Sequence, residues 1–183
     1  MYQLKGAVRF FALLAAKILP GYRAKNNGKF EPFKVIYSSS SILVCMPFDY
    51  NEFQAAMPVL NELAREFPEC YITVAVIESF RNWLERPLLS KIIPLRPYHA
   101  NIFKLPSGRL KQDLLEKSYD IAVNLNHDDK LFSSILCAVS GAVVRVGFAD
   151  GECDKYYNFL VRPKDSLDIR AKYVTLLNYI RGV

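Results

Sequence analysis

Two apolar stretches of this chain are each followed by residues that could do chemistry. Asn51 and Glu52 come shortly after residues 42–46, and His127 comes shortly after residues 119–125. A positioned carboxylate such as that of Glu52 can accept a proton from a substrate hydroxyl. Loops that cradle phosphate are rich in glycine, and the loop before Glu52 has none, so the pattern does not predict a nucleotide-phosphate site there.

Each of these groups also has a structural interpretation. The spacing of Asp49 and Glu52 is typical of a capping box, and acidic side chains stabilise the first turn of a helix through its dipole. His127, Asp128 and Asp129 together could bind a metal or donate protons, but Asp128 equally suits the N-cap of a following helix. The sequence leaves the roles of Glu52 and of the His127 cluster open. One histidine and two carboxylates are weak evidence for a metal site, so we expect neither a metal nor a cofactor.

Apolar runs of strand length alternate with helical patterns along most of the chain. We expect strands at 42–46, 71–77, 91–95, 119–125, 143–146 and 158–161, and helices at 53–67, 80–84, 107–117, 129–139 and 168–180. The central strands are continuously apolar, which is typical of a parallel sheet covered by helices on both faces. The pattern therefore predicts an α/β protein with three layers, α/β/α.

The net charge of +6 and the isoelectric point near 9.1 favour anionic partners such as phosphorylated sugars or anionic lipid. No recognition motif for nucleic acid is present, so nucleic acid is not an expected partner. Five basic residues in the middle of the chain fit either an anionic ligand or a solvated face, namely Arg81, Arg86, Lys91, Arg96 and Arg109.

The four cysteines, Cys45, Cys70, Cys137 and Cys153, are far apart and form no Cys-x-x-Cys pair. Two of them lie inside apolar segments, and the chain has only two histidines, so a zinc site is not expected. Free thiols in a reducing compartment are the simplest explanation, which favours a cytoplasmic location.

The first 20 residues suggest an amphipathic helix that ends before Pro20. Its apolar stripe is expected at Leu4, Val8, Phe11, Ala15 and Ile18. The apolar run is too short to span a bilayer, and no small-residue cleavage site follows it. The helix could dock on the domain or lie on a membrane surface. Residues 20–34 resemble a linker, so we predict a helix and linker at 1–34 and a single domain at 35–183.

Four stretches, in order and spacing, resemble the ADP-heptose:lipopolysaccharide heptosyltransferases. Residues 42–68, ILVCMPFDYNEFQAAMPVLNELAREFP, resemble the family's opening strand, loop and xxPxLxxLxxxFP helix. YDIAVNLN at 119–126 and SGAVVRVGF at 140–148 resemble two later strands, and the final helix, with Tyr173, resembles the one that closes the family's first domain. The likeness covers about residues 40–183.

The resemblance implies a Rossmann-like domain of the GT-B type, in which the first domain holds the acceptor sugar and the second holds the nucleotide-sugar donor. It implies metal-independent transfer for lipopolysaccharide or another cell-envelope glycan. This chain would correspond to the first domain, so we expect it to be inactive alone and to need a partner glycosyltransferase or donor-domain protein. The expected acceptor is an anionic glycan or lipid-linked sugar.

The resemblance also implies a set of site residues. The family's Gly-Asp, whose aspartate is the general base, becomes Asn51-Glu52, so Glu52 is the catalytic candidate. The family's Asp-x-Gln corresponds to Asn124 and Asn126, and Lys130 matches a basic position. We expect Asn51, Asn124, Asn126 and Lys130 to bind the acceptor. Glutamate adds a methylene, and a misplacement of about 1 Å can cost about a hundredfold in rate.

Two other functions are compatible with the sequence. One is a non-catalytic scaffold that binds a glycan or lipid headgroup, peripheral on the inner membrane through residues 1–20. The other is a different Rossmann-like enzyme acting on a small molecule, which the absence of a phosphate-binding glycine loop disfavours.

Overall fold

Six parallel strands form the centre of the structure, a computed structural model that describes residues 6–18, 31–84, 89–127, 131–149 and 151–182. Their order across the sheet is β3-β2-β1-β4-β5-β6, and every neighbouring pair is parallel. The strands are β1 Ser41–Cys45, β2 Tyr71–Ile77, β3 Lys91–Leu95, β4 Ile121–Asn124, β5 Val144–Phe148 and β6 Phe159–Val161. This is the doubly wound, Rossmann-like order, and the predicted α/β class is confirmed.

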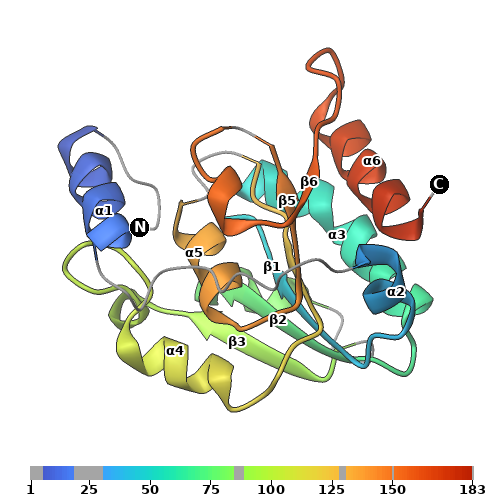
Figure 1. The fold of residues 1–183 in the computed structure, drawn as a ribbon, viewed down its shortest axis with the longest axis horizontal. Helices are drawn as coiled ribbons and strands as arrows, with labels where there is room; N and C mark the ends of the chain where they lie inside the picture. The colour runs from blue at the N-terminus through green and yellow to red at the C-terminus, as the bar shows by residue number, and fades with distance from the viewer. Residues whose placement is uncertain (1–5, 19–30, 85–88, 128–130, 150, 183) are drawn as a thin grey trace.

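Helices cover both faces of the sheet (Figure 1). One face packs against α2 Pro32–Tyr37, α3 Tyr50–Glu66 and α6 Ile169–Arg181. The other packs against α1 Gly6–Ile18, α4 Gly108–Leu115, α5 Leu131–Val139 and the short helix η5 Asp154–Tyr156. Successive residues of β1 alternate between the two cores, with Ile42 and Val44 in one and Leu43 and Cys45 in the other. Two short helices, η2 Glu78–Trp83 and η4 Pro97–His99, follow β2 and β3.

Helix α2 was not expected, because its residues overlap the predicted linker. Pro32 opens it, and Ile36 is buried in the core. The Tyr37 hydroxyl donates to the carbonyl of Arg181 at 2.8 Å, and the Phe33 ring meets Phe159 edge to face. These distant contacts stabilise a helix too short to form alone, which explains why local pattern did not reveal it. The proposed division at residue 34 stays a prediction.

Helix α1 packs on the domain through small residues. Ala12 and Ala16 are buried in the core, whereas Val8 and Phe11, expected on the stripe, are exposed. The helix therefore docks through its alanines, which allow close approach, and the larger side chains of the expected apolar stripe that the structure describes stay exposed. Within the described ranges, no helix has the length and apolar character to cross a bilayer.

All four cysteines are free thiols. Cys45 and Cys137 lie 3.7 Å apart, sulfur to sulfur, in the core. The hydrogen bond between them, together with burial, raises the pKa of the Cys45 thiol, so it stays protonated.

Candidate functional site

The strand order reverses between β1 and β4, and in doubly wound folds such a reversal marks the position of a crevice at the carboxyl edge of the sheet. The chain leaving β1 turns to α3 on one face, whereas the chain leaving β4 turns to α5 on the other. Ligands of doubly wound proteins bind in such a crevice. The residues that follow β1 and β4 are therefore the ones to inspect.

Asp49 sets the start of α3. Its carboxylate accepts hydrogen bonds from the backbone amides of Asn51, at 2.8 Å, and Glu52, at 3.1 Å. An N-cap of this kind satisfies amide groups that the helix itself leaves unbonded. The helix consequently begins at Tyr50, three residues earlier than expected. Asn51 is exposed in the first turn, at the edge of the crevice.

Glu52 reaches across the crevice to the loop after β4. Its Oε2 accepts a hydrogen bond from the backbone amide of His127 at 3.1 Å. The side chain is half-buried, and this hydrogen bond holds its carboxylate between the two loops. The expected pairing of Asp49 and Glu52 at one helix terminus is thus only half of the arrangement: Asp49 caps the helix, and Glu52 bonds to a different loop.

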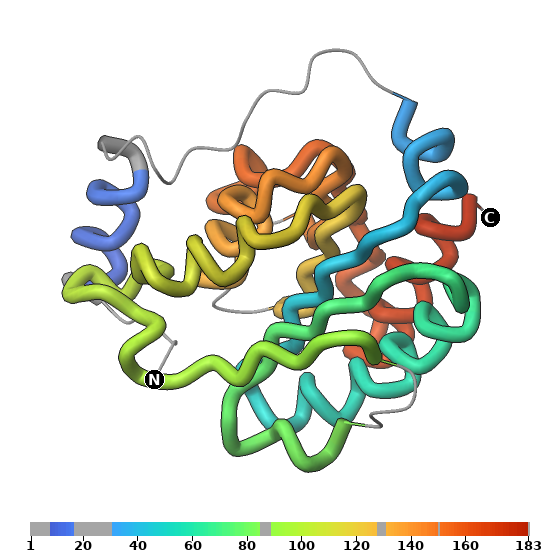
Figure 2. Tube along the Cα trace, turned by 90° about the horizontal axis from the view of Figure 1, so that it is seen from below, coloured from blue at the N-terminus to red at the C-terminus, as the bar shows by residue number. Residues whose placement is uncertain are grey.

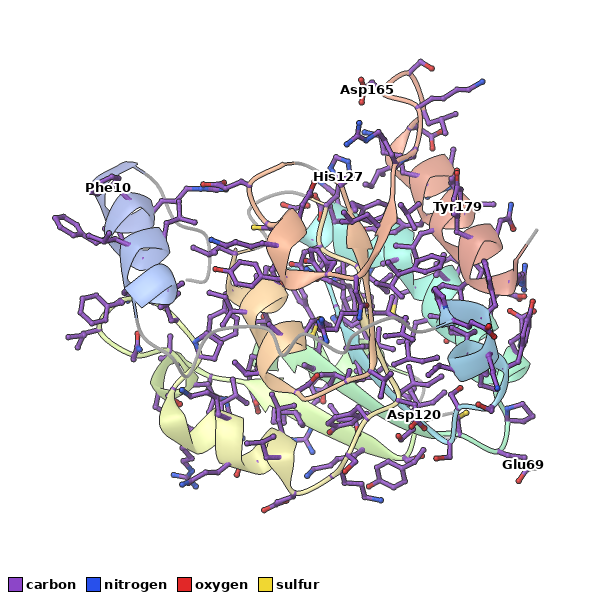
Figure 3. The ribbon with its side chains drawn as sticks, in the orientation of Figure 1. Phe10, Glu69, Asp120, His127, Asp165 and Tyr179 are labelled. Atoms are coloured by element: carbon purple, nitrogen blue, oxygen red, sulfur yellow. The ribbon has the colours of Figure 1, made fainter. Side chains whose placement is uncertain are left out.

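His127 connects this carboxylate to α6. Its Nε2 lies 3.2 Å from the Nζ of Lys172, and because an ammonium only donates, the imidazole nitrogen accepts. The ring also packs edge-on against Phe148, with centroids 5.4 Å apart. Figure 3 shows His127 at this end of the sheet. The residues Glu52, His127 and Lys172 thus bring a carboxylate, an imidazole and a cation together, and the sequence did not single out Lys172.

Asn124 and Asn126 lie inside the protein behind the crevice. The Asn126 amide donates to the carbonyl of Met46 at 3.0 Å and to the Oδ1 of Asn124 at 2.9 Å, and its own Oδ1 accepts from the amide of Phe48 at 3.1 Å. Both side chains are almost fully buried. Their expected contact with an acceptor stays a prediction, and their observed bonds tie the loop after β1 to the loop after β4.

Tyr157 completes this buried network, and no sequence pattern singled it out. The Asn124 amide donates to its hydroxyl at 2.6 Å, and Ser134 also bonds to that hydroxyl. Burial raises the pKa of Tyr157 well above its ordinary value, so the hydroxyl stays neutral. The ring lies against Gly147, where an added Cβ would come within 2.5 Å of two ring carbons. This close approach explains the glycine in β5.

A shallow groove of about 470 Å³ runs along the outer side of α3. The exposed Trp83 borders it, and the ring of Tyr50, two residues before Glu52, lies 6.2 Å from Trp83. The groove thus presents an aromatic ring, that of Trp83, and the side-chain amides of Gln54 and Asn61. The residues that line the groove are Gln54, Met57, Pro58, Asn61, Glu62, Arg65 and Trp83.

The basic residues in the middle of the chain do not form one patch. Arg96 pairs with Glu78 at 3.0 Å, and Lys91 pairs with Glu116 at 3.4 Å. Arg109 lies over the ring of Tyr98. Arg86, Asp128, Asp129 and Lys130 lie outside the described residues. In the part of the chain that the structure describes, no three His, Cys, Asp or Glu side chains gather as metal ligands would.

Comparison with solved structures finds the same fold in glycosyltransferases. A glycosyl transferase family 9 protein from Veillonella parvula DSM 2008 matches with a TM-score of 0.65 and 16% identity, over 85% of this chain and 43% of that chain. E. coli heptosyltransferase WaaC with ADP matches with a TM-score of 0.57 and 14% identity, over 78% and 47%. E. coli ADP-heptose lps heptosyltransferase II matches with a TM-score of 0.59 and 22% identity, over 75% and 40%.

These matches confirm the resemblance at the level of fold, and the chain spans less than half the length of each of the three enzymes. No protein-family model matches the chain, and a search of curated proteins finds no match.

Proposed function

We propose that this chain is the acceptor-side lobe of a glycosyltransferase of the heptosyltransferase type. It would bind an anionic saccharide of lipopolysaccharide or a related cell-envelope glycan. The nucleotide sugar would be bound by a lobe outside these 183 residues, in the same polypeptide or in a partner. The observation that carries the proposal is the carboxylate of Glu52 at the crevice between β1 and β4, in a fold that glycosyltransferases share.

In this proposal Glu52 is the general base. Its carboxylate takes the proton of an acceptor hydroxyl, the hydroxyl oxygen bonds to the anomeric carbon of the donor sugar, and the nucleoside diphosphate leaves with the electron pair of the broken bond. The amide of His127 supports this role because it orients the carboxylate from across the crevice. General-base catalysis typically contributes about 10²- to 10⁴-fold in rate.

The acceptor would lie between the crevice and the groove on α3. Asn51 lies in the first turn of α3 next to Glu52, and Trp83, beside Tyr50, would offer an apolar ring face to a sugar. Lys130 and Lys172 would meet an anionic group of the acceptor. Asn124 and Asn126 would position the two loops from behind the site.

A non-catalytic glycan-binding scaffold is the second candidate. The observation in its favour is that Asp49, Glu52 and Asn126 all bond to backbone groups of the protein itself. Such bonds stabilise loops whether or not a reaction follows. A scaffold would keep the saccharide site and would have no use for the basicity of Glu52.

Binding distinguishes the lobe assignment from its alternatives. We expect deacylated lipopolysaccharide core oligosaccharide to raise the melting temperature of the chain, because a ligand that binds the native state stabilises it. We expect no such rise with ADP-heptose alone. A rise with the nucleotide sugar and none with the oligosaccharide would overturn the acceptor assignment.

Turnover then separates the enzyme from the scaffold. The substitution Glu52→Gln keeps an oxygen that can accept from His127 but removes the base. In an assay of ADP-heptose consumption with the donor-lobe protein present, we expect a fall of at least about a hundredfold. Oligosaccharide binding should persist, and Asn51→Ala serves as the neighbouring control for acceptor contact. Unchanged turnover in Glu52→Gln would remove Glu52 from the mechanism.

A further inference from the structure

The outer side of α1 carries large apolar side chains that the domain does not cover. Phe10 is 63% exposed, Phe11 is 57% exposed, and Val8 and Leu14 are also exposed. Figure 3 shows Phe10 pointing away from the domain at one end of the molecule. Burying these side chains would release free energy in proportion to the apolar area removed from water.

The helix is held in this orientation by its opposite side. Ala12 and Ala16 are buried in the same core as Leu105, and Arg9 pairs with Glu152 from the segment after β5. The exposed phenylalanines therefore belong to a docked helix whose small residues face inward. The contacts of Ala12, Ala16 and Arg9 therefore determine that Phe10 and Phe11 face solvent.

A loop beside α1 extends the apolar surface. Ile102 stands at its tip and is 87% exposed. The Oδ1 of Asn101 accepts from the amides of Phe103, at 2.9 Å, and Leu105, at 3.1 Å, and Lys104 adopts a left-handed φ of 57°. A non-glycine residue in this region needs such local bonds to hold it. These hydrogen bonds hold the loop in a conformation that leaves Ile102 exposed.

Figures 1 and 2 show this loop next to α1 from two directions. We define the apolar face as Val8, Phe10, Phe11, Leu14 and Ile102. It joins two segments that lie far apart in sequence.

The positive charge of the chain is concentrated in the sequence segment that contains α1. Residues 1–34 contain seven Lys and Arg and one acidic residue, which equals the +6 of the whole chain. Residues 35–183 are therefore neutral overall, with equal numbers of basic and acidic residues. Four of the five residues of the apolar face thus belong to the segment with a strong charge bias, and Lys104 adds a basic group two residues after Ile102.

We propose that the apolar face docks on an anionic phospholipid bilayer. Helix α1 would lie in the plane of the interface with Phe10 and Phe11 entering the boundary between headgroups and acyl chains. The basic residues of 1–34 would be attracted to the negative surface potential of the lipid. The charge bias favours lipid over a neutral protein partner. This inference stands on residues outside the crevice and does not depend on the glycosyltransferase proposal.

Vesicle sedimentation with the full chain tests the inference. We expect binding to vesicles of phosphatidylcholine mixed with phosphatidylglycerol, weak binding to phosphatidylcholine alone, and loss of binding at high salt. The double substitution Phe10→Ser and Phe11→Ser should weaken binding at least about tenfold, and Ile102→Ser should weaken it by a smaller factor.

The matched control is a double substitution on α6, Val174→Ser and Tyr179→Ser, which removes apolar side chains of similar exposure. Tyr179 lies at the other end of the molecule from Phe10 (Figure 3). This control should bind as the unchanged chain does, and the melting temperature of each variant reports that it is folded. No binding to the anionic vesicles, or equal losses in both double variants, would overturn the inference. The inference would also be overturned if the chain bound no lipid and instead formed a dimer that the Phe10→Ser, Phe11→Ser variant does not form.

Discussion

At each end of the β1–β4 strand pair, a carboxylate next to one strand accepts hydrogen bonds from residues next to the other strand. At the amino end Asp120, just before β4, meets Ser40 and Ser41 at the start of β1. At the carboxyl end Glu52, beyond β1, meets the amide of His127, beyond β4. Figure 3 shows Asp120 and His127 at opposite ends of the sheet.

The Asp120 carboxylate is held by four hydrogen bonds to one of its oxygens. Its Oδ2 accepts from the amide and hydroxyl of Ser40, at 2.8 and 3.1 Å, and from the amide and hydroxyl of Ser41, both at 3.1 Å. Burial by itself would raise the pKa of Asp120, but these hydrogen bonds outweigh it and lower the pKa below its ordinary value. The charged form is therefore the stable one.

The difference between the two carboxylates follows from chain direction. At the amino edge the two strands enter the sheet side by side, so short serines can surround Asp120. At the carboxyl edge the chains diverge to opposite faces, so Glu52 spans the position at which doubly wound proteins bind their ligands. The same chemical group thus stabilises the fold at one end and, as we propose, acts on a substrate at the other. Four substitutions test this contrast.

The largest effect is expected behind the carboxyl edge. Replacing Asn126 by alanine removes the bonds that join the two loops, including those to the amide of Phe48 and the carbonyl of Met46. We expect the free energy of unfolding to fall by about 3 kcal/mol, because each unsatisfied buried group costs about 1–3 kcal/mol. Urea denaturation measures it. A loss no larger than that of the exposed control Asn51→Ala would show that the loops do not need this amide.

Asp120→Asn should lower the free energy of unfolding by about 1–2 kcal/mol at neutral pH, because hydrogen bonds to a charged acceptor are lost. A lowered native-state pKa contributes stability above the unfolded-state pKa, and that contribution is lost as the pH falls through the native-state value. The difference in stability between the two proteins should therefore begin to shrink as the pH falls below about 4 and disappear below the native-state pKa. A difference that persists undiminished in acid would assign the effect to packing.

Asp49→Ala removes the N-cap of α3. We expect a loss of about 1 kcal/mol in the free energy of unfolding, typical of an N-cap that accepts from two amides. Asp49→Ser, which can still accept from these amides, should restore most of it. Equal losses in the alanine and serine variants would indicate that the cap bonds contribute little.

The smallest effect on stability is expected for Glu52→Gln, a change of less than about 0.5 kcal/mol, because the amide oxygen can still accept from His127. This is the sharpest test of the contrast, since the matching change at Asp120 should be costly. A loss at Glu52 as large as the loss at Asp120 would place both carboxylates in the same structural role and favour the scaffold.

Much of the fold follows from local pattern. The apolar runs predicted all six strands, and their continuous character predicted parallel pairing, both of which are confirmed. The helices predicted at 53–67 and 107–117 begin within three residues of the predicted starts, at Tyr50 and Gly108. Such features depend on residues within one turn or one strand, so their physical causes lie within a short window of sequence.

The candidate site was only partly predictable. Glu52 and His127 were recognised as candidates, but their contact joins residues 75 positions apart. The serine run that contains Ser40 gave no sign of its partner Asp120, 80 residues away. Lys172 was not identified at all, because a lysine on a helix looks the same whether it faces solvent or an imidazole.

The sequence by itself therefore determined the strands, most of the helices and the parallel sheet, because hydrophobic period and capping act locally. Only the tertiary structure decided which polar groups meet at each edge of the sheet, that Asn124 and Asn126 face inward, and that α1 docks through alanines. Those outcomes depend on strand order and on how closely helices can approach the sheet, and no single segment contains that information.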